Sequence, residues 1–306
     1  MRIEPSNVLR NKAKAAGATQ WLDNVPTLVD ELSIEWGFTV DHGFADGTEA
    51  FVAAVTMHDG SAAVLKLLIP RADAFENHEI TVLQLANGDG CAALLRADPE
   101  RRALLLERLG PSVHDLGLPL AQRHEIMCAT ALAFWRPALD SGLRTGAVKG
   151  QWLIDSITTL WVELDRPCSE AAIDLAVKCA RRRIAAHDDQ RAVLVHGDVH
   201  EWNTLQAGDG FKLIDPDGLI AEPEYDLGII MREDADVLLA APSVMDASWQ
   251  RAHWLADRCG LDAVATWEWG VVERVSTGLL ATSLDLQPFG REMLAVSDAL
   301  AEASNS

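Results

Sequence analysis

The chain has 306 residues, of which 26 are Lys or Arg and 46 are Asp or Glu, so its formal net charge is −20. With 49% hydrophobic and 24% charged residues, the composition is typical of a globular protein with a sizeable core and excludes a disordered chain. So acidic a surface repels nucleic acid and anionic membranes. It should instead attract cations, either metals or polyamine-like molecules.

Signals that would direct the chain into a membrane or out of the cytoplasm are not found in the sequence. No apolar stretch reaches the roughly 18 residues of a membrane span, and the first residues lack the apolar core of a signal peptide. The five cysteines are scattered, without the spacing of a disulfide framework or a zinc site. We expect a cytoplasmic protein with reduced cysteines and favour a monomer.

The first third of the chain is predicted to be rich in strands. An amphipathic helical stretch within the first fifty residues precedes two strands, 51–57 and 62–69, which an Asp-Gly turn joins into a hairpin. Helical spacing resumes over residues 73–87 and ends at a glycine. Two more short strands are expected at 92–95 and 103–107.

The rest of the chain is predicted to be mainly helical, with one small β insertion between residues 193 and 214. The expected helices are 120–135, 151–164, 169–187, 244–258 and 262–284. A Gly-Pro pair at 110–111 marks the change of character. The pattern predicts an α+β chain with a β-rich N-terminal lobe over residues 1–108 and a helical C-terminal lobe over residues 109–306.

The densest chemical signal is the string His-Gly-Asp-Val-His-Glu-Trp-Asn at residues 196–203, followed by Ile-Asp-Pro-Asp at 214–217. Phosphoryl transfer to a hydroxyl needs a carboxylate that orients the hydroxyl and accepts its proton, and Asp198 suits that role. Asn203 and Asp215 supply the hard oxygen ligands that Mg²⁺ prefers. Asn203 follows Asp198 at the interval found in the kinase catalytic loop.

A second signal is Lys66, which lies in the apolar strand Val64–Leu67. Burying an ammonium group costs free energy unless an anion meets it. Two anions are available, the phosphates of a nucleotide and a glutamate of the following helix, where Glu79 is better placed than Glu76. A strand lysine paired with a helix glutamate is the kinase arrangement.

These motifs, together with Glu-Tyr-Asp-Leu-Gly at 224–228, resemble those of the aminoglycoside phosphotransferase family. Trp36, the strand around Lys66 and the segment Leu104–Leu109 add a resemblance to its streptomycin and hydroxyurea phosphotransferase branch. The resemblance implies a two-lobed protein-kinase-like fold and an antibiotic resistance kinase that uses ATP and Mg²⁺. Its acceptor would be a cationic, hydroxylated small molecule, with streptomycin the leading candidate and hydroxyurea or another hydroxylated antibiotic still open.

The resemblance also implies roles for residues of the first lobe. Lys66 would bind the α- and β-phosphates, and Glu79 would anchor it. The backbone around Glu107 and Leu109 would contact the adenine. The loop that covers the phosphates departs from the usual glycine pattern, and Thr48 with its neighbouring amides is expected to contact phosphate there.

In the second lobe, the resemblance makes Asp198 the catalytic base, makes Asn203 and Asp215 the Mg²⁺ ligands, and has Asp226 bracing the catalytic loop. His196 and His200 have a spacing that can bind zinc on a helix, but the neighbouring glycine favours a loop in which they form hydrogen bonds. Asp217 is interpreted either as a neighbour of the metal or as a solvated side chain.

A polycationic acceptor would need carboxylates around it. For each candidate, a solvated helix face is an equally good interpretation. The candidates are a tryptophan of the catalytic loop, in a region that the family uses near the acceptor, and seven acidic residues: Trp202, Glu201, Glu233, Asp234, Asp236, Glu268, Glu273 and Asp285.

Three other functions fit the sequence less well than an antibiotic kinase does. A metallophosphoesterase shares the Gly-Asp-x-His segment but needs further metal-binding motifs that the sequence lacks. An inactive kinase-like binding module would have lost one of Lys66, Asp198, Asn203 or Asp215, and all four are present. A protein kinase would carry Phe-Gly after Asp215, where this chain has Pro-Asp.

Overall fold

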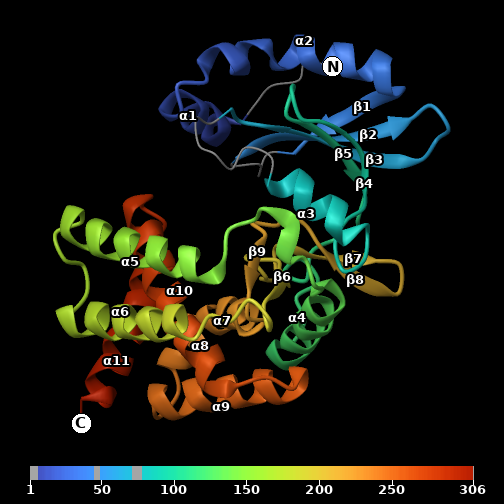
Figure 1. Ribbon diagram of the computed structural model, residues 1–306. Helices are drawn as coiled ribbons and strands as arrows, with labels where there is room; N and C mark the ends of the chain where they lie inside the picture. The colour runs from blue at the N-terminus through green and yellow to red at the C-terminus, as the bar shows by residue number, and fades with distance from the viewer. Residues whose placement is uncertain (1–5, 45–48, 71–77, 306) are drawn as a thin grey trace. The chain divides into compact units, whose positions relative to one another are not determined.

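The computed structural model describes residues 6–44, 49–70 and 78–305 (Figure 1). The chain divides into two compact units, residues 1–110 and residues 111–306. Within the described residues, no helix combines the length and the apolar character needed to cross a membrane.

Unit 1 is built on a five-stranded antiparallel sheet of order β1-β2-β3-β5-β4. Three helices accompany it, and α2 packs its apolar face, which includes Leu28 and Leu32, into one core with the sheet. The elements are α1 (Asn7–Ala15), α2 (Thr19–Trp36), β1 (Phe38–Gly43), β2 (Ala50–Met57), β3 (Ala62–Leu68), α3 (His78–Ala86), β4 (Leu94–Asp98) and β5 (Ala103–Glu107).

Strand β3 lies in the middle of this sheet, between β2 and β5. Lys66 is opposite Val52 on one side and Leu104 on the other. Because apolar residues surround it on both neighbouring strands, the Lys66 side chain is buried. This position makes an anionic partner necessary.

Unit 2 is mainly helical, with two small two-stranded sheets, β6 with β9 and β7 with β8. Helix α10 lies at its centre and packs against five other helices (Figure 1). The elements are α4 (Leu120–Phe134), α5 (Gly146–Glu163), α6 (Glu170–Ala185), β6 (Val193–Val195), β7 (Thr204–Ala207), β8 (Gly210–Leu213), β9 (Leu219–Ala221), α7 (Glu224–Arg232), α8 (Ala235–Leu239), α9 (Val244–Cys259), α10 (Ala263–Ser283) and α11 (Phe289–Ser304).

Helices α7 and α10 cross so closely that their contact requires two glycines. A Cβ atom added at Gly228 would collide with Trp269, and one added at Gly270 would lie 2.5 Å from the Cβ of Met231. This crossing fixes the position of α7, whose two ends matter for the site described below.

Replacing Gly228 by Ala is therefore expected to destabilise the protein by about 3 kcal/mol or more, since an added methyl group there must push the α10 backbone away. Chemical denaturation measures the loss. Gly210→Ala is the matched control, because a Cβ at Gly210 meets nothing closer than 3.9 Å. Equal stability of the two variants would show that the crossing tolerates the methyl group.

The α+β class and the succession of a β-rich and a helical part are confirmed. The strands predicted at 51–57 and 62–69 and the long helices of the second part are present. The fourth strand begins at Leu94 rather than at residue 92, and residues 73–77 of the predicted helix lie outside the described residues. The prediction missed strands β1 and β9 and helices α7, α8 and α11.

Candidate active site

The segment 196–203 forms the loop between β6 and β7, and hydrogen bonds bind it to the segment after β8. His196 donates from Nε2 to the carbonyl of Ile214 (3.0 Å) and accepts on Nδ1 from the amide of Asp198 (3.2 Å). Gly218 donates its amide to the His196 carbonyl (2.9 Å). Burial lowers the pKa of His196 to about 4. This histidine is therefore a neutral structural link, and the expected hydrogen bonds within the loop are present.

Asp226, in the first turn of α7, binds the same loop through hydrogen bonds. Its carboxylate accepts from the amides of His196 (2.9 Å) and Gly197 (2.8 Å) and from the indole of Trp135 (2.8 Å). Asp226 is fully buried, and that burial raises its pKa to about 6, although these hydrogen bonds work in the other direction. Gly197 has a φ of 86°, which glycine adopts without strain, so the chain turns sharply just before Asp198.

Three side chains surround the carboxylate of Asp198. Arg232 donates to Oδ1 (2.9 Å), while His200 (3.2 Å) and the amide of Asn203 (3.1 Å) contact Oδ2. Loss of hydration opposes ionisation, but His200 and Arg232 outweigh it and hold the pKa of Asp198 well below its usual value. Asp198 is thus an oriented, ionised carboxylate, 35% of whose side-chain surface is exposed.

Asn203 and Asp215 come together because the amide of Ile214 donates to the Asn203 carbonyl (2.9 Å). The Asn203 side chain donates from Nδ2 to Asp198, so its orientation reserves the carbonyl oxygen Oδ1 for another partner. Asp215 is exposed and has a φ of 58°, a left-handed backbone conformation. An amide oxygen beside an exposed carboxylate suits Mg²⁺.

No group of three or more His, Cys, Asp or Glu side chains that could hold a metal occurs in the part of the chain that the structure describes. A site made by Asn203 and Asp215 would therefore take its remaining ligands from phosphate oxygens and water. That composition is usual for Mg²⁺ in phosphoryl-transfer enzymes.

In unit 1, the Lys66 ammonium donates to Glu79 at 2.6 Å, and both side chains are largely buried. The glutamate predicted from the sequence is thus the partner found. The amide of Glu107 is used inside the sheet, where it donates to Ala93 (2.9 Å), and Leu109 is half-buried beyond the strand. Thr48 lies outside the described residues.

Most of the carboxylates expected to bind the acceptor form ion pairs with arginines of this chain. Glu201 and Asp234 share Arg123, while Glu233 and Glu273 share Arg232. The prediction that Glu268 and Glu273 receive the acceptor is wrong, because both side chains are buried. Glu268 pairs with Arg182 and Arg183, and Glu273 also accepts from the hydroxyl of Tyr225. Neither is open to a ligand in this structure.

The remaining acceptor candidates are on the surface. Trp202 is 54% exposed, and its ring stacks on His114 with the centroids 3.5 Å apart. Asp236 and Asp285 are exposed. Asp217 is also exposed, and the buried Lys149 donates to it at 3.3 Å.

Sequence reasoning missed the basic residues of this site, Arg232, Arg123 and Lys149. Arg232 could have been predicted, because it is the one basic residue at the end of the apolar run that follows Asp226. Arg123 and Lys149 had none, since each lies far in sequence from the carboxylates that it contacts.

Comparison with known proteins gives a consistent result. Residues 35–278 match the family of aminoglycoside/hydroxyurea antibiotic resistance kinases. A streptomycin 6-kinase from Streptomyces glaucescens is 27% identical over 277 residues, which cover 87% of each chain. A hydroxyurea phosphotransferase from Kitasatospora aureofaciens is 29% identical over 232 residues, 73% of this chain and 66% of that protein.

Solved structures agree on the fold. Amicoumacin kinase hAmiN superposes with a TM-score of 0.59 at 12% identity, over 91% of this chain and 93% of that one. Choline kinase from Cryptosporidium parvum Iowa II superposes with a TM-score of 0.57 at 9% identity, over 92% and 95%. The predicted protein-kinase-like fold is confirmed.

Proposed function

The chain belongs to the aminoglycoside/hydroxyurea antibiotic resistance kinase family, and we propose that it transfers the γ-phosphate of ATP to a hydroxyl group of an antibiotic. The observation that carries this proposal is the environment of Asp198. Its carboxylate is kept ionised by Arg232 and lies beside an asparagine whose amide oxygen is left for a metal. This arrangement fits a base that orients a hydroxyl for in-line attack.

In the proposed mechanism, Lys66 with Glu79 positions the α- and β-phosphates, and the backbone near Leu109 contacts the adenine. Asn203 Oδ1 and the Asp215 carboxylate would hold Mg²⁺, which supplies positive charge to the phosphates when bound. Asp198 accepts a hydrogen bond from the acceptor hydroxyl. As the new O–P bond forms and the bond to ADP breaks, the hydroxyl proton passes to Asp198.

The depressed pKa of Asp198 has a consequence for the timing of that proton transfer. A weakly basic carboxylate removes a proton only once the attacking oxygen has become strongly acidic, late in a loose transition state. Asp198 therefore orients the hydroxyl first and accepts its proton afterwards.

Streptomycin is the leading acceptor because a relative of that activity aligns over most of the chain. The net charge of −20 would also attract a polycation. Hydroxyurea is the second candidate, supported by the relative that is 29% identical.

A screen for ATP-dependent phosphate transfer tests the proposal. Purified protein with Mg²⁺ and ATP is incubated with streptomycin, other aminoglycosides, further hydroxylated antibiotics and hydroxyurea, and both ADP release and the phosphorylated product are measured. Acceptor-dependent product with one of them supports the proposed function. ADP release without product, or no ADP release with any acceptor, would contradict it.

Lys66→Ala is expected to raise the KM for ATP about tenfold or more and to lower kcat. The change removes the ammonium group that would meet the phosphates, and it leaves Glu79 without the partner it has at 2.6 Å. Nucleotide titration and steady-state kinetics measure both effects. Unchanged turnover and KM would exclude β3 from the nucleotide site.

A further inference from the structure

Two cysteines that lie far apart in sequence meet where helices α4 and α9 of unit 2 pack against each other (Figure 1). The thiol of Cys128 on α4 donates a hydrogen bond to the sulfur of Cys259, the last residue of α9. Both are free thiols in this structure. Because sulfur atoms at hydrogen-bonding distance need only a small movement to form a bond of about 2.05 Å, the pair is well placed for a disulfide.

Neighbouring contacts hold the two helices together at this point. Glu125, one turn before Cys128 on α4, forms an ion pair with Arg258, the residue before the cysteine of α9. One residue earlier on α4, the ring centroid of His124 lies 6.0 Å from that of Trp254 on α9. The contact between the two sulfurs is therefore part of a packed interface between helices, and the same side chains keep the cysteines facing each other.

The two thiols differ in exposure and in their tendency to ionise. Cys128 is buried, whereas Cys259 is partly exposed at the end of its helix. The hydrogen bond from Cys128 lowers the pKa of Cys259, and Arg258 acts in the same direction against the effect of partial burial. The same hydrogen bond and deeper burial raise the pKa of Cys128 above its usual value. An oxidant can therefore reach Cys259 as a thiolate, while Cys128 stays protonated beside it.

The two other cysteines of unit 2 do not have this combination of properties. Burial raises the pKa of Cys168 to about 12 and that of Cys179 to about 12, so both stay protonated at neutral pH. Oxidation-sensitive cysteines are accessible thiolates, often next to a second cysteine that can react with the first oxidation product. Among the described residues of unit 2, the pair of Cys259 and Cys128 meets both conditions.

We propose that Cys259 and Cys128 form a redox modification site, at which hydrogen peroxide converts the two thiols into a disulfide between α9 and α4. The Cys259 thiolate attacks one peroxide oxygen, an S–O bond forms as the O–O bond breaks, and the leaving hydroxide takes up a proton as water. The Cys128 sulfur then attacks the Cys259 sulfur, the S–S bond forms as the S–O bond breaks, and the Cys128 proton leaves with the hydroxyl as a second water. The sulfurs lose two electrons in all, and one peroxide is reduced.

This site goes beyond the proposed phosphotransfer, in which neither cysteine takes part. Its two helices also hold the surroundings of the catalytic loop, because Arg123 on α4 pairs with Glu201 and Arg251 on α9 donates to the Glu233 carbonyl (2.6 Å). A bond between the two cysteines closes a loop of about 130 residues. Since cross-links over long loops restrict the unfolded chain most, oxidation should raise the Tm by roughly 5 °C.

Treatment of the fully reduced protein with hydrogen peroxide tests the site. Peptide mapping by mass spectrometry should find an intramolecular disulfide between Cys128 and Cys259, which dithiothreitol reverses. Thermal unfolding without reductant should show the higher Tm of the oxidised protein. In Cys128→Ser, the hydroxyl can still donate to Cys259 but cannot form a disulfide, so oxidation should stop at a sulfenic acid that dimedone traps on Cys259.

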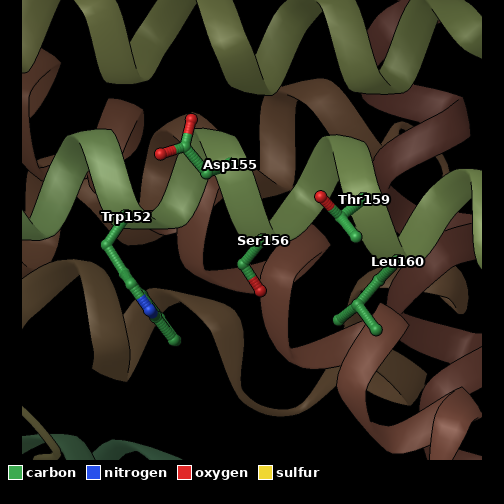
Figure 2. A pocket seen from close by; sticks show the side chains of 5 residues that line it. All are labelled: Trp152, Asp155, Ser156, Thr159 and Leu160. Atoms are coloured by element: carbon green, nitrogen blue, oxygen red, sulfur yellow. The ribbon is translucent and has the colours of Figure 1, made fainter. Parts of the chain in front are cut away.

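Two control variants separate the pair from accessible or buried thiols in general. Figure 2 shows Ser156 at a hollow along α5 whose lining residues include no cysteine, and Ser156 is half-buried, as Cys259 is. The thiol introduced by Ser156→Cys should be oxidised about tenfold or more slowly than Cys259, because it has no second thiol to donate to it. Cys168→Ser removes a buried thiol and should leave the disulfide unchanged.

Three results would each overturn the inference. They are a disulfide between two molecules instead of within one, oxidation of Cys259 no faster than that of the thiol introduced at position 156, and wild-type oxidation that stops at the sulfenic acid. None of these measurements uses phosphotransfer. They therefore decide about the redox site whether or not the protein phosphorylates an antibiotic, and a failed acceptor screen leaves them unchanged.

Discussion

Replacing Asp198 by Asn is expected to lower kcat about a thousandfold while ATP affinity changes by less than about threefold. The amide has the size of the carboxylate and can still accept from Arg232 or His200. It cannot take the proton of the acceptor hydroxyl, and it carries no charge to orient that hydroxyl. The loss therefore falls on the chemical step and spares nucleotide binding, which the mechanism assigns to Lys66 and the metal.

Two measurements together check this result. Product formation with the best acceptor of the screen gives kcat, and calorimetric titration with a non-hydrolysable ATP analogue gives the nucleotide affinity. Asp257→Asn, which neutralises an exposed carboxylate on α9, controls for the loss of one negative charge from the protein. A kcat within about tenfold of the wild type would remove Asp198 from the role of base.

The central part of this site could be predicted because its residues are close in sequence. Asp198 and Asn203 lie in one loop, and the pairing of Asn203 with the segment before Asp215 follows from the short β7–β8 hairpin. Lys66 could be predicted because a buried ammonium group in an apolar strand needs an anion. Each of these inferences depends on local pattern and on the cost of an unpaired charge.

The elements that the prediction missed show where local pattern fails. Helix α7 has no solvent-facing stripe, because all its residues from Glu224 to Met231, charged ones included, are buried. Strand β9 has three residues, which is too short for an alternating pattern. Helix α11 is different, since Met293, Val296 and Leu300 do recur at helical spacing, and a closer count would have found it.

Choosing acceptor residues from the sequence meets a different difficulty, as the buried Glu268 and Glu273 show. A sequence displays all of its carboxylates alike, and only tertiary structure shows which are already paired. Arg123 lies 78 residues from Glu201 and 111 from Asp234, yet it occupies both. Lys149 is likewise 68 residues from Asp217, which it contacts at 3.3 Å. The charge of −20 is therefore a poor guide to the charge that an acceptor meets.

Arg232→Met is expected to lower kcat/KM about a hundredfold at neutral pH and to move the acidic limb of its pH profile upward. Arg232 contacts Asp198 (2.9 Å), Glu233 (2.8 Å) and Glu273 (3.5 Å). Without it, three carboxylates face one another with no guanidinium between them. Removing one partner of such a buried network costs about 3–5 kcal/mol, so folding must be checked at every pH used.

The direction of the pH effect follows from the role of the charge. Arg232 and His200 keep the pKa of Asp198 below its usual value, so Asp198 stays ionised as the pH falls through the usual range. Loss of Arg232 raises that pKa, and activity that needs the ionised form is then lost at a higher pH. Arg232→Lys keeps the charge and should restore the limb, although a single ammonium cannot reach all three carboxylates. A variant that merely unfolds would lose active protein without moving the limb, and that result would reduce Arg232 to a structural ion pair.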